Sequence, residues 1–229
     1  MQRPIDRRVA AGGFSVAAIV MLCAVGFARA PLPAIDVRDP AAARDLVGLM
    51  RAGERGRWIA SYQYTRTLAN GRTLRQLVRE GRGESLHVVI AGTTMSIESG
   101  DRSFDCNTVG DRAGCTRSPV GKSLPDSEVL RVAVAIGAYD VVRRPDATIA
   151  GLRAHCFRVR ATGEGGLPDL GVETDQCLSA GGITLRLLVV RPPGTVDDQV
   201  ATDVQRSATT RQVVNLARSF APNAPTSGR

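Results

Sequence analysis

Apolar and polar residues alternate with a period of two over most of the chain, which indicates β-strands with one buried face. The clearest strand begins at residue 58, and one of its faces carries Trp58, Ala60, Tyr62 and Tyr64. Asn70-Gly71 then gives a strong hairpin signal, and a strand returns over 73–80. A two-residue turn here places Arg66 opposite Arg75. The same pattern predicts further strands at 86–91, 94–98, 103–106, 154–161, 173–179, 184–191 and 200–206.

Helical spacing replaces this alternation just before the first strand. Asp39 can cap a helix that has Pro40 in its first turn, and glycines 53 and 56 end it. Near the C-terminus, a short apolar segment at 214–220 is predicted to dock on the domain.

A second helix is predicted between two groups of strands. Pro125 lies at its start, and Ser123 and Asp126 are candidate caps. Its body, 129–136, is apolar nearly all round, whereas a surface helix carries a single apolar stripe. We therefore expect this helix to be buried on several sides. A buried strand is the alternative, because the segment contains three valines.

An uncharged apolar run covers residues 9–28 and follows three arginines. As a helix it would span about 30 Å, the thickness of the hydrocarbon core of a bilayer. A cleaved signal peptide is the alternative, because Ala28-Arg29-Ala30 has the small-x-small pattern, although Pro31 follows the cut. We favour an uncleaved single-pass anchor in the plasma membrane. Residues 1–8 then stay cytoplasmic, and under either interpretation the rest of the chain is exported.

Composition favours one exported domain. A hydrophobic fraction of 43% excludes a disordered chain, and a mean hydropathy of -0.05 excludes a polytopic membrane protein. The net charge of +8 comes almost wholly from arginine, because Lys122 is the only lysine. These charges are scattered, so we expect no nucleic-acid partner. We assign 29–38 to a linker, 39–220 to the domain and 221–229 to a disordered tail.

Four cysteines follow the apolar run: Cys106, Cys115, Cys156 and Cys177. An even number in an exported domain predicts two disulfides, for which three pairings exist. We favour the local pairing, because each pair flanks a glycine-containing loop, as two adjacent antiparallel strands would. A zinc site is the alternative, but the chain has no Cys-x-x-Cys and only two histidines, His87 and His155. We therefore expect no metal.

No catalytic motif is recognisable, and we expect neither enzymatic activity nor a cofactor. The segment 120–123 resembles the end of a phosphate-binding loop, but Thr116 occupies the position where that motif requires glycine. No serine lies in a Gly-x-Ser-x-Gly turn, and a Ser-His-Asp triad would have to use one of the two histidines.

The order of the elements resembles one known superfamily. An apolar N-terminal segment, a short helix, a meander of hairpins, a very apolar helix and four more strands follow one another, and the hairpin at 177–186 reads CLSAGGITLR. This pattern resembles the LolA/LppX/LprG-like superfamily of bacterial lipoprotein carriers and mycobacterial lipid-binding lipoproteins. The resemblance covers about residues 39–220. The sequence departs from this pattern in two ways. Its predicted disulfides are not part of the pattern of the carriers, and it lacks a lipobox, because Leu22 precedes Cys23 where that motif requires a small residue.

The resemblance implies an α+β fold, in which a curled antiparallel sheet forms a half-barrel with one or two helices on its concave face. Such a fold leaves an aliphatic crevice that suits acyl chains, so we expect the domain to bind a lipid or other amphiphile in the cell envelope. The predicted lining residues are Trp58, Tyr62, Tyr64, Val132, Ile136 and Tyr139. The alternative is that these apolar residues pack against one another as a filled core and leave no cavity. The alternative function is a sensor or regulatory module that contacts a membrane or envelope partner protein.

Overall fold

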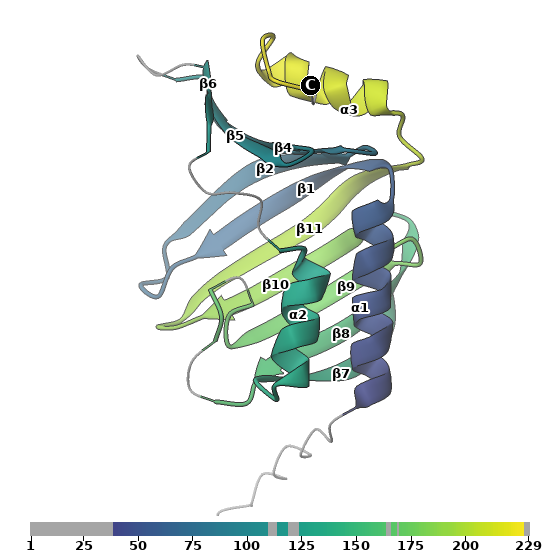
Figure 1. The fold of residues 1–229 in the computed structure, drawn as a ribbon. Helices are drawn as coiled ribbons and strands as arrows, with labels where there is room; N and C mark the ends of the chain where they lie inside the picture. The colour runs from purple at the N-terminus through teal and green to yellow at the C-terminus, as the bar shows by residue number, and fades with distance from the viewer. Residues whose placement is uncertain (1–38, 110–113, 119–123, 164–165, 169, 227–229) are drawn as a thin grey trace, which may run out of the picture. The chain divides into compact units, whose positions relative to one another are not determined.

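The alternating segments form one antiparallel sheet of eleven strands (Figure 1). The computed structural model describes residues 39–109, 114–118, 124–163, 166–168 and 170–226. The strands are β1 (Trp58–Thr67), β2 (Thr73–Arg82), β3 (Leu86–Ala91), β4 (Thr94–Ser99), β5 (Arg102–Asn107), β6 (Gly114–Arg117), β7 (Tyr139–Ile149), β8 (Leu152–Ala161), β9 (Glu173–Ser179), β10 (Thr184–Arg191) and β11 (Thr195–Arg206).

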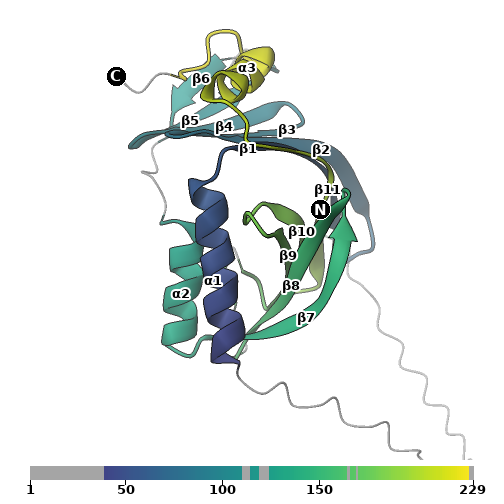
Figure 2. The ribbon, with the colours of Figure 1, turned by 90° about the vertical axis from the view of Figure 1, so that its right-hand side faces the viewer.

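The strand order in the sheet is β6-β5-β4-β3-β2-β1-β11-β10-β9-β8-β7. Two meanders, β1 to β6 and β7 to β11, are joined where β1 pairs with β11. The edges β6 and β7 do not pair with each other, so the sheet stays open, and it is strongly curled (Figure 2). The fold is therefore α+β with an open, curled antiparallel sheet, as the sequence predicted.

Three helices pack on this sheet: α1 (Pro40–Arg55), α2 (Asp126–Ala135) and α3 (Thr210–Phe220). α1 and α2 lie side by side on the concave side, whereas α3 packs against β2, β3 and β4 on the opposite face (Figure 2). The Asp39 carboxylate accepts hydrogen bonds from the backbone N–H groups of Ala41 and Ala42, so the predicted cap of α1 is confirmed. In the part of the chain that the structure describes, no helix is long and apolar enough to cross a membrane, and the predicted anchor at 9–28 lies outside that part.

The hydrophobic core has three clusters, one for each place where the sheet is covered. The first joins α1 and α2 to residues of β7, β8 and β9, the second joins α3 to β3, β4 and β5, and the third surrounds Trp58 and Tyr62. All three clusters and every described helix and strand lie within the compact unit 36–229. This unit therefore contains the whole described core.

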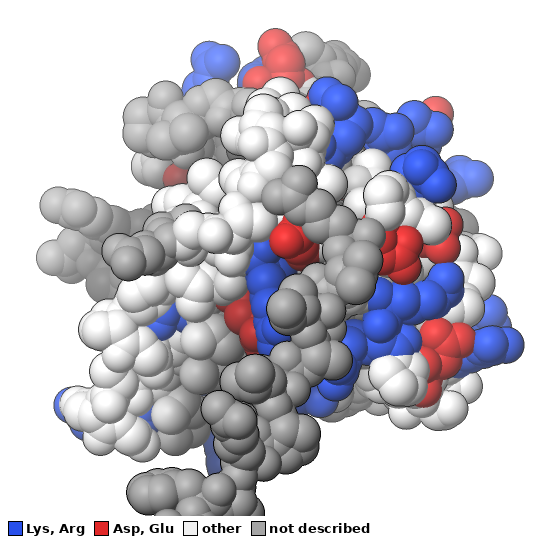
Figure 3. All heavy atoms as spheres, turned by 90° about the horizontal axis from the view of Figure 1, so that it is seen from below, with Lys and Arg blue, Asp and Glu red and all other residues white. Residues whose placement is uncertain are grey.

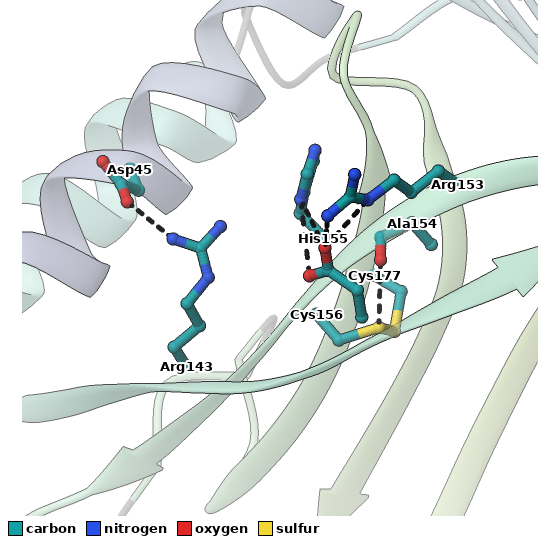
Figure 4. A network of polar contacts seen from close by, with 8 residues as sticks. Asp45, Arg143, Arg153, Ala154, His155, Cys156 and Cys177 are labelled. Atoms are coloured by element: carbon teal, nitrogen blue, oxygen red, sulfur yellow. Dashed lines mark hydrogen bonds and ion pairs between the residues drawn. A yellow bond between two sulfur atoms is a disulfide. The ribbon is translucent and has the colours of Figure 1, made fainter.

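The local disulfide pairing is confirmed. Cys106 in β5 is bonded to Cys115 in β6, and Cys156 in β8 is bonded to Cys177 in β9. In both cases the two cysteines lie directly opposite each other on adjacent antiparallel strands. Figure 4 shows the second disulfide, which crosses between its two strands.

The first hairpin has a different register from the one predicted. Its loop is longer than the predicted two-residue turn, because the Leu68 N–H donates to the Arg72 carbonyl oxygen. Arg66 consequently lies opposite Leu74 rather than opposite Arg75. This register separates two guanidinium groups that the predicted turn would have paired.

The second helix is also packed differently from the prediction. Leu130 and Ala133 of α2 are buried, but Val132 is 41% exposed and the adjacent Ile136 is 75% exposed, so burial on several sides was wrong. The reason is that α2 lies outermost, between α1 and solvent, and packs through one side only. Asp126 is the first residue of the helix, whose N-cap position is occupied by Pro125 without a side-chain hydrogen bond, and Ser123 lies outside the described residues.

Near the C-terminus the chain forms the third helix. The apolar segment at 214–220 is the second half of α3, which starts with a capping box formed by Thr209 and Gln212. Beyond α3, Ala224 is 7% exposed and packs in the α3 cluster, and residues 227–229 of the predicted tail lie outside the described residues.

Candidate functional site

A groove of about 460 Å³ lies between α1 and α2. Its lining side chains come from one face of each helix: Pro40, Ala43, Arg44, Val47, Gly48 and Arg51 of α1, and Arg131, Val134 and Ala135 of α2. The α1 positions recur at helical spacing, so they form one continuous wall. Gly48 borders open space in the groove, because a Cβ atom at this position would meet no other atom within 4 Å.

The groove is apolar along its floor and positively charged around it. Arg44, Arg51 and Arg131 contribute guanidinium groups, and Glu128 pairs with Arg51 and Arg131. Arg131 Nε lies 2.9 Å and Arg51 Nη2 3.3 Å from Glu128 Oε2. The hydrogen bonds from Arg131, and less strongly those from Arg51, hold the pKa of Glu128 below its usual value. Arg44 forms no ion pair with any residue that the structure describes, so an excess of positive charge remains beside an apolar channel.

A second hollow of about 240 Å³ extends the groove at the N-terminal end of α1. It shares Pro40, Ala43 and Val134 with the groove and reaches Tyr139 at the start of β7. The Tyr139 hydroxyl is not available to a ligand, because it donates to the Gly171 carbonyl oxygen at 2.6 Å and accepts from the Leu167 N–H.

The six predicted lining residues do not lie together. Trp58 and Tyr62 are buried in the third core cluster, and the Trp58 indole N–H donates to the Gly53 carbonyl oxygen at 3.0 Å. The Tyr64 hydroxyl donates to Asp197 at 2.6 Å; burial and this bond raise the pKa of Tyr64 to about 12. Val132 and Ile136 face solvent on α2. A role of these residues in ligand binding stays a prediction.

Sequence reasoning missed the α1 wall of the groove. The apolar positions of α1 were recognised as helical, but their partners on α2 lie more than seventy residues further along the chain. The one local signal is the spacing of Arg44 and Arg51, which puts both on one helix face beside Val47.

A polar cluster occupies the concave face where β2, β3 and β4 meet the two helices. His87 Nε2 lies 2.7 Å from Glu80 Oε1, and His87 Nδ1 lies 3.5 Å from Glu98 Oε2. Burial lowers the pKa of His87, but its hydrogen bonds to Glu80 and Glu98 outweigh that effect, so the pKa lies above its usual value. A cavity of about 210 Å³ beside His87 also contacts Glu54 and Arg82.

Both ring nitrogens of His87 are therefore engaged by carboxylates, and neither is free to take a proton from a substrate. The cluster instead supports α2: Glu54 of α1 accepts hydrogen bonds from the Ser127 N–H at 2.9 Å and the Ser127 hydroxyl at 2.6 Å. Glu54 therefore satisfies a backbone N–H group in the first turn of α2, as the side chain of an N-cap residue would. Among the described residues, no group of three His, Cys, Asp or Glu side chains could hold a metal ion.

His155, the other histidine, lies beside the second disulfide. Its Nδ1 atom is 3.2 Å from Asp146, and Arg153 bonds the same carboxylate at 2.9 Å (Figure 4). Nearby, Arg143 points toward Asp45 of α1 at 3.0 Å. These groups link strands to one another and a strand to a helix. Figure 3 likewise shows basic and acidic side chains next to each other on one face rather than in an unbroken basic patch.

No protein-family model matches the sequence, and no curated protein matches it. Solved structures do. A chain of the MucA/MucB complex of Pseudomonas aeruginosa is 17% identical with a TM-score of 0.53, over 76% of this chain and 60% of that one. The two chains share a fold. This chain therefore spans about three fifths of the length of that relative.

Members of the superfamily that the sequence resembles also occur among the similar structures. A LolA superfamily protein from Nitrosomonas europaea is 6% identical with a TM-score of 0.38, over 75% of this chain and 96% of that one. LprF from Mycobacterium bovis is 12% identical with a TM-score of 0.34, over the same shares of the two chains. At these identities the likeness concerns the fold alone.

Proposed function

We propose that this chain is an extracytoplasmic domain that binds an amphiphile with an anionic head in the groove between α1 and α2. The observation that carries the proposal is the groove itself: an apolar channel beside three guanidinium groups that are matched by one carboxylate. Its volume of about 460 Å³ lies within the range of small-ligand sites. The family resemblance and the fold shared with lipoprotein carriers support the same function.

The two parts of the ligand would bind through different interactions. Val47, Val134 and Ala135 form an aliphatic wall for the acyl chain. Each methylene group buried against it contributes about 0.8 kcal/mol to binding and needs no directional contact. The head group, a carboxylate or a phosphate, would then bind Arg44, whose guanidinium lacks a partner among the described residues.

The location of the domain follows from separate observations. Two disulfides are typical of a protein in an oxidising, exported compartment. The apolar run at 9–28 has the length of a membrane anchor that keeps residues 1–8 in the cytoplasm. We therefore place the bound amphiphile at the outer face of the plasma membrane.

The test is native mass spectrometry of the 36–229 unit, produced in an oxidising compartment and offered oleate, lysophosphatidylglycerol and lysophosphatidylcholine. We expect uptake of the two anionic probes, which distinguish a carboxylate from a phosphate, and weaker uptake of the zwitterionic one. Gly48→Leu should abolish uptake, because the new side chain fills open space in the groove. Gly48→Ala adds only a methyl group and serves as the matched control.

Two results would reject the proposal. The first is an unchanged protein mass with every probe, which would leave the envelope-partner function as the alternative. The second is equal uptake by Gly48→Leu and by the unsubstituted domain, which would place any ligand elsewhere.

A further inference from the structure

The outward side of α2 is an apolar stripe that nothing in the described chain covers. Val129, Val132 and Ile136 recur at helical spacing, and the latter two are 41% and 75% exposed. A surface helix normally presents polar residues on this side, so the stripe requires an explanation.

Positive charge lies beside the stripe, in the groove between α1 and α2. Arg131 lines this groove on α2, and Arg44 and Arg51 line it on α1. An apolar helix face next to a cluster of arginines is typical of a surface that lies in the interface of an anionic membrane. Glu128 offsets one of the three positive charges.

The path of the chain points to the same occupant. Pro40, the first residue of α1, lines the groove together with Ala135, the last residue of α2, so the domain begins at the end of the stripe where Ile136 is most exposed. The linker at 29–38 spans at most about 35 Å when fully extended. A membrane-embedded run at 9–28 would thus keep this end of the domain near a bilayer.

We propose that Val132 and Ile136 enter the head-group region of an anionic bilayer, with the arginines of the adjacent groove against lipid phosphates. The inference rests on the proposed exported location but not on a ligand in the groove. It gives the domain a fixed orientation, in which the open groove between α1 and α2 lies beside the lipid surface.

Another pair of exposed leucines provides the comparison. Leu74 and Leu77 of β2 are 54% and 56% exposed and also have arginine neighbours. Because they are three residues apart on a strand, their side chains lie on opposite faces and form no common apolar surface. They serve as a control matched in residue type and exposure.

The experiment is flotation of the 36–229 unit with vesicles of phosphatidylcholine alone or with about one third phosphatidylglycerol. We expect binding to the anionic vesicles only, and its loss at about 1 M salt, where the Debye length falls to about 3 Å. The double variant Val132→Ser, Ile136→Ser should bind at least about tenfold more weakly, because two aliphatic side chains no longer enter the lipid. The double variant Leu74→Ser, Leu77→Ser should bind normally.

Thermal unfolding checks that each variant is folded, and sedimentation detects self-association. Absence of binding to anionic vesicles, unchanged binding of the α2 variant, or an equal loss in the β2 variant would overturn the inference. A stripe-dependent dimer without vesicle binding would overturn it as well and make a second copy the occupant. Gly48→Leu separates the two proposals, because it should block amphiphile uptake and leave vesicle binding intact.

Discussion

α1 approaches the β9–β10 turn so closely that one methyl group should decide the stability of the domain. A Cβ atom added to Gly53 would lie 2.1 Å from the Gly182 carbonyl oxygen and 2.7 Å from its carbonyl carbon. Both are backbone atoms, and Gly182 has a φ of +79°. No flexible side chain in the turn can therefore move to make room for the new methyl group. Gly53→Ala must therefore push α1 away from the sheet by roughly 1 Å to reach the shortest separation that real Cβ atoms show.

Two opposing terms set the magnitude. Replacing glycine by alanine inside a helix stabilises it by about 1 kcal/mol, whereas overpacking a well-packed contact costs about 1–3 kcal/mol or more. The displacement also loosens the first core cluster, in which Leu46 and Met50 pack. Because the helix gain offsets about 1 kcal/mol of that cost, we expect Gly53→Ala to lower the free energy of unfolding by up to about 2 kcal/mol.

Gly48→Ala is the matched control, because it makes the same change on the same helix with no atom within 4 Å of the new methyl group. It should raise the free energy of unfolding by up to about 1 kcal/mol, so the two variants should differ by the overpacking cost alone, about 1–3 kcal/mol. Denaturant unfolding of the disulfide-intact chain, followed by the fluorescence of the single tryptophan, Trp58, measures this difference. Equal stability of the two variants would show that α1 does not sit against the turn as described.

Two further predictions concern the polar cluster and the disulfides. Because the folded-state pKa of His87 is raised, its contribution to stability should be complete below the pKa of an unfolded histidine, near 6.5, and lost as pH rises through the folded-state value. The free energy of unfolding, measured across this pH range, should fall as pH rises, and His87→Gln should remove this fall. The same pH dependence in the variant would show that His87 does not cause it. Replacing both Cys156 and Cys177 by alanine should lower the free energy of unfolding by about 3 kcal/mol. The same change at Cys106 and Cys115 should lower it somewhat less, because these cysteines are separated by 9 residues and the other two by 21. Urea unfolding of both double variants tests the order, and a larger loss for the shorter loop would refute the loop-closure argument.

The sequence alone determined those features that depend on neighbouring residues. The strands at 173–179 and 184–191 have the predicted boundaries, because the alternation is regular and Gly181-Gly182 marks the turn between them. The first helix begins where Asp39 caps it. The local disulfides followed from cysteines that flank short loops, since such loops bring adjacent strands into register.

Some elements were missed because their local signal conflicts with their structure. β7 was not predicted, since Arg143, Arg144, Pro145 and Asp146 interrupt its apolar alternation. The strand forms because it pairs with β8, with a register irregularity between Arg144 and Ala147 that accommodates Pro145. Only pairing with another part of the chain could reveal this.

Tertiary structure alone decided the candidate site. The composition of α2 is nearly as apolar on the side that faces solvent as on the side that faces α1, so its sequence did not distinguish a buried helix from one that is half exposed. The groove is lined by residues of α1 such as Gly48 and by Arg131, Val134 and Ala135 of α2, which lie so far apart in the sequence that no local pattern connects them. Periodicity specifies which residues share a face, whereas the packing of distant segments determines whether that face meets the core, a ligand or a membrane.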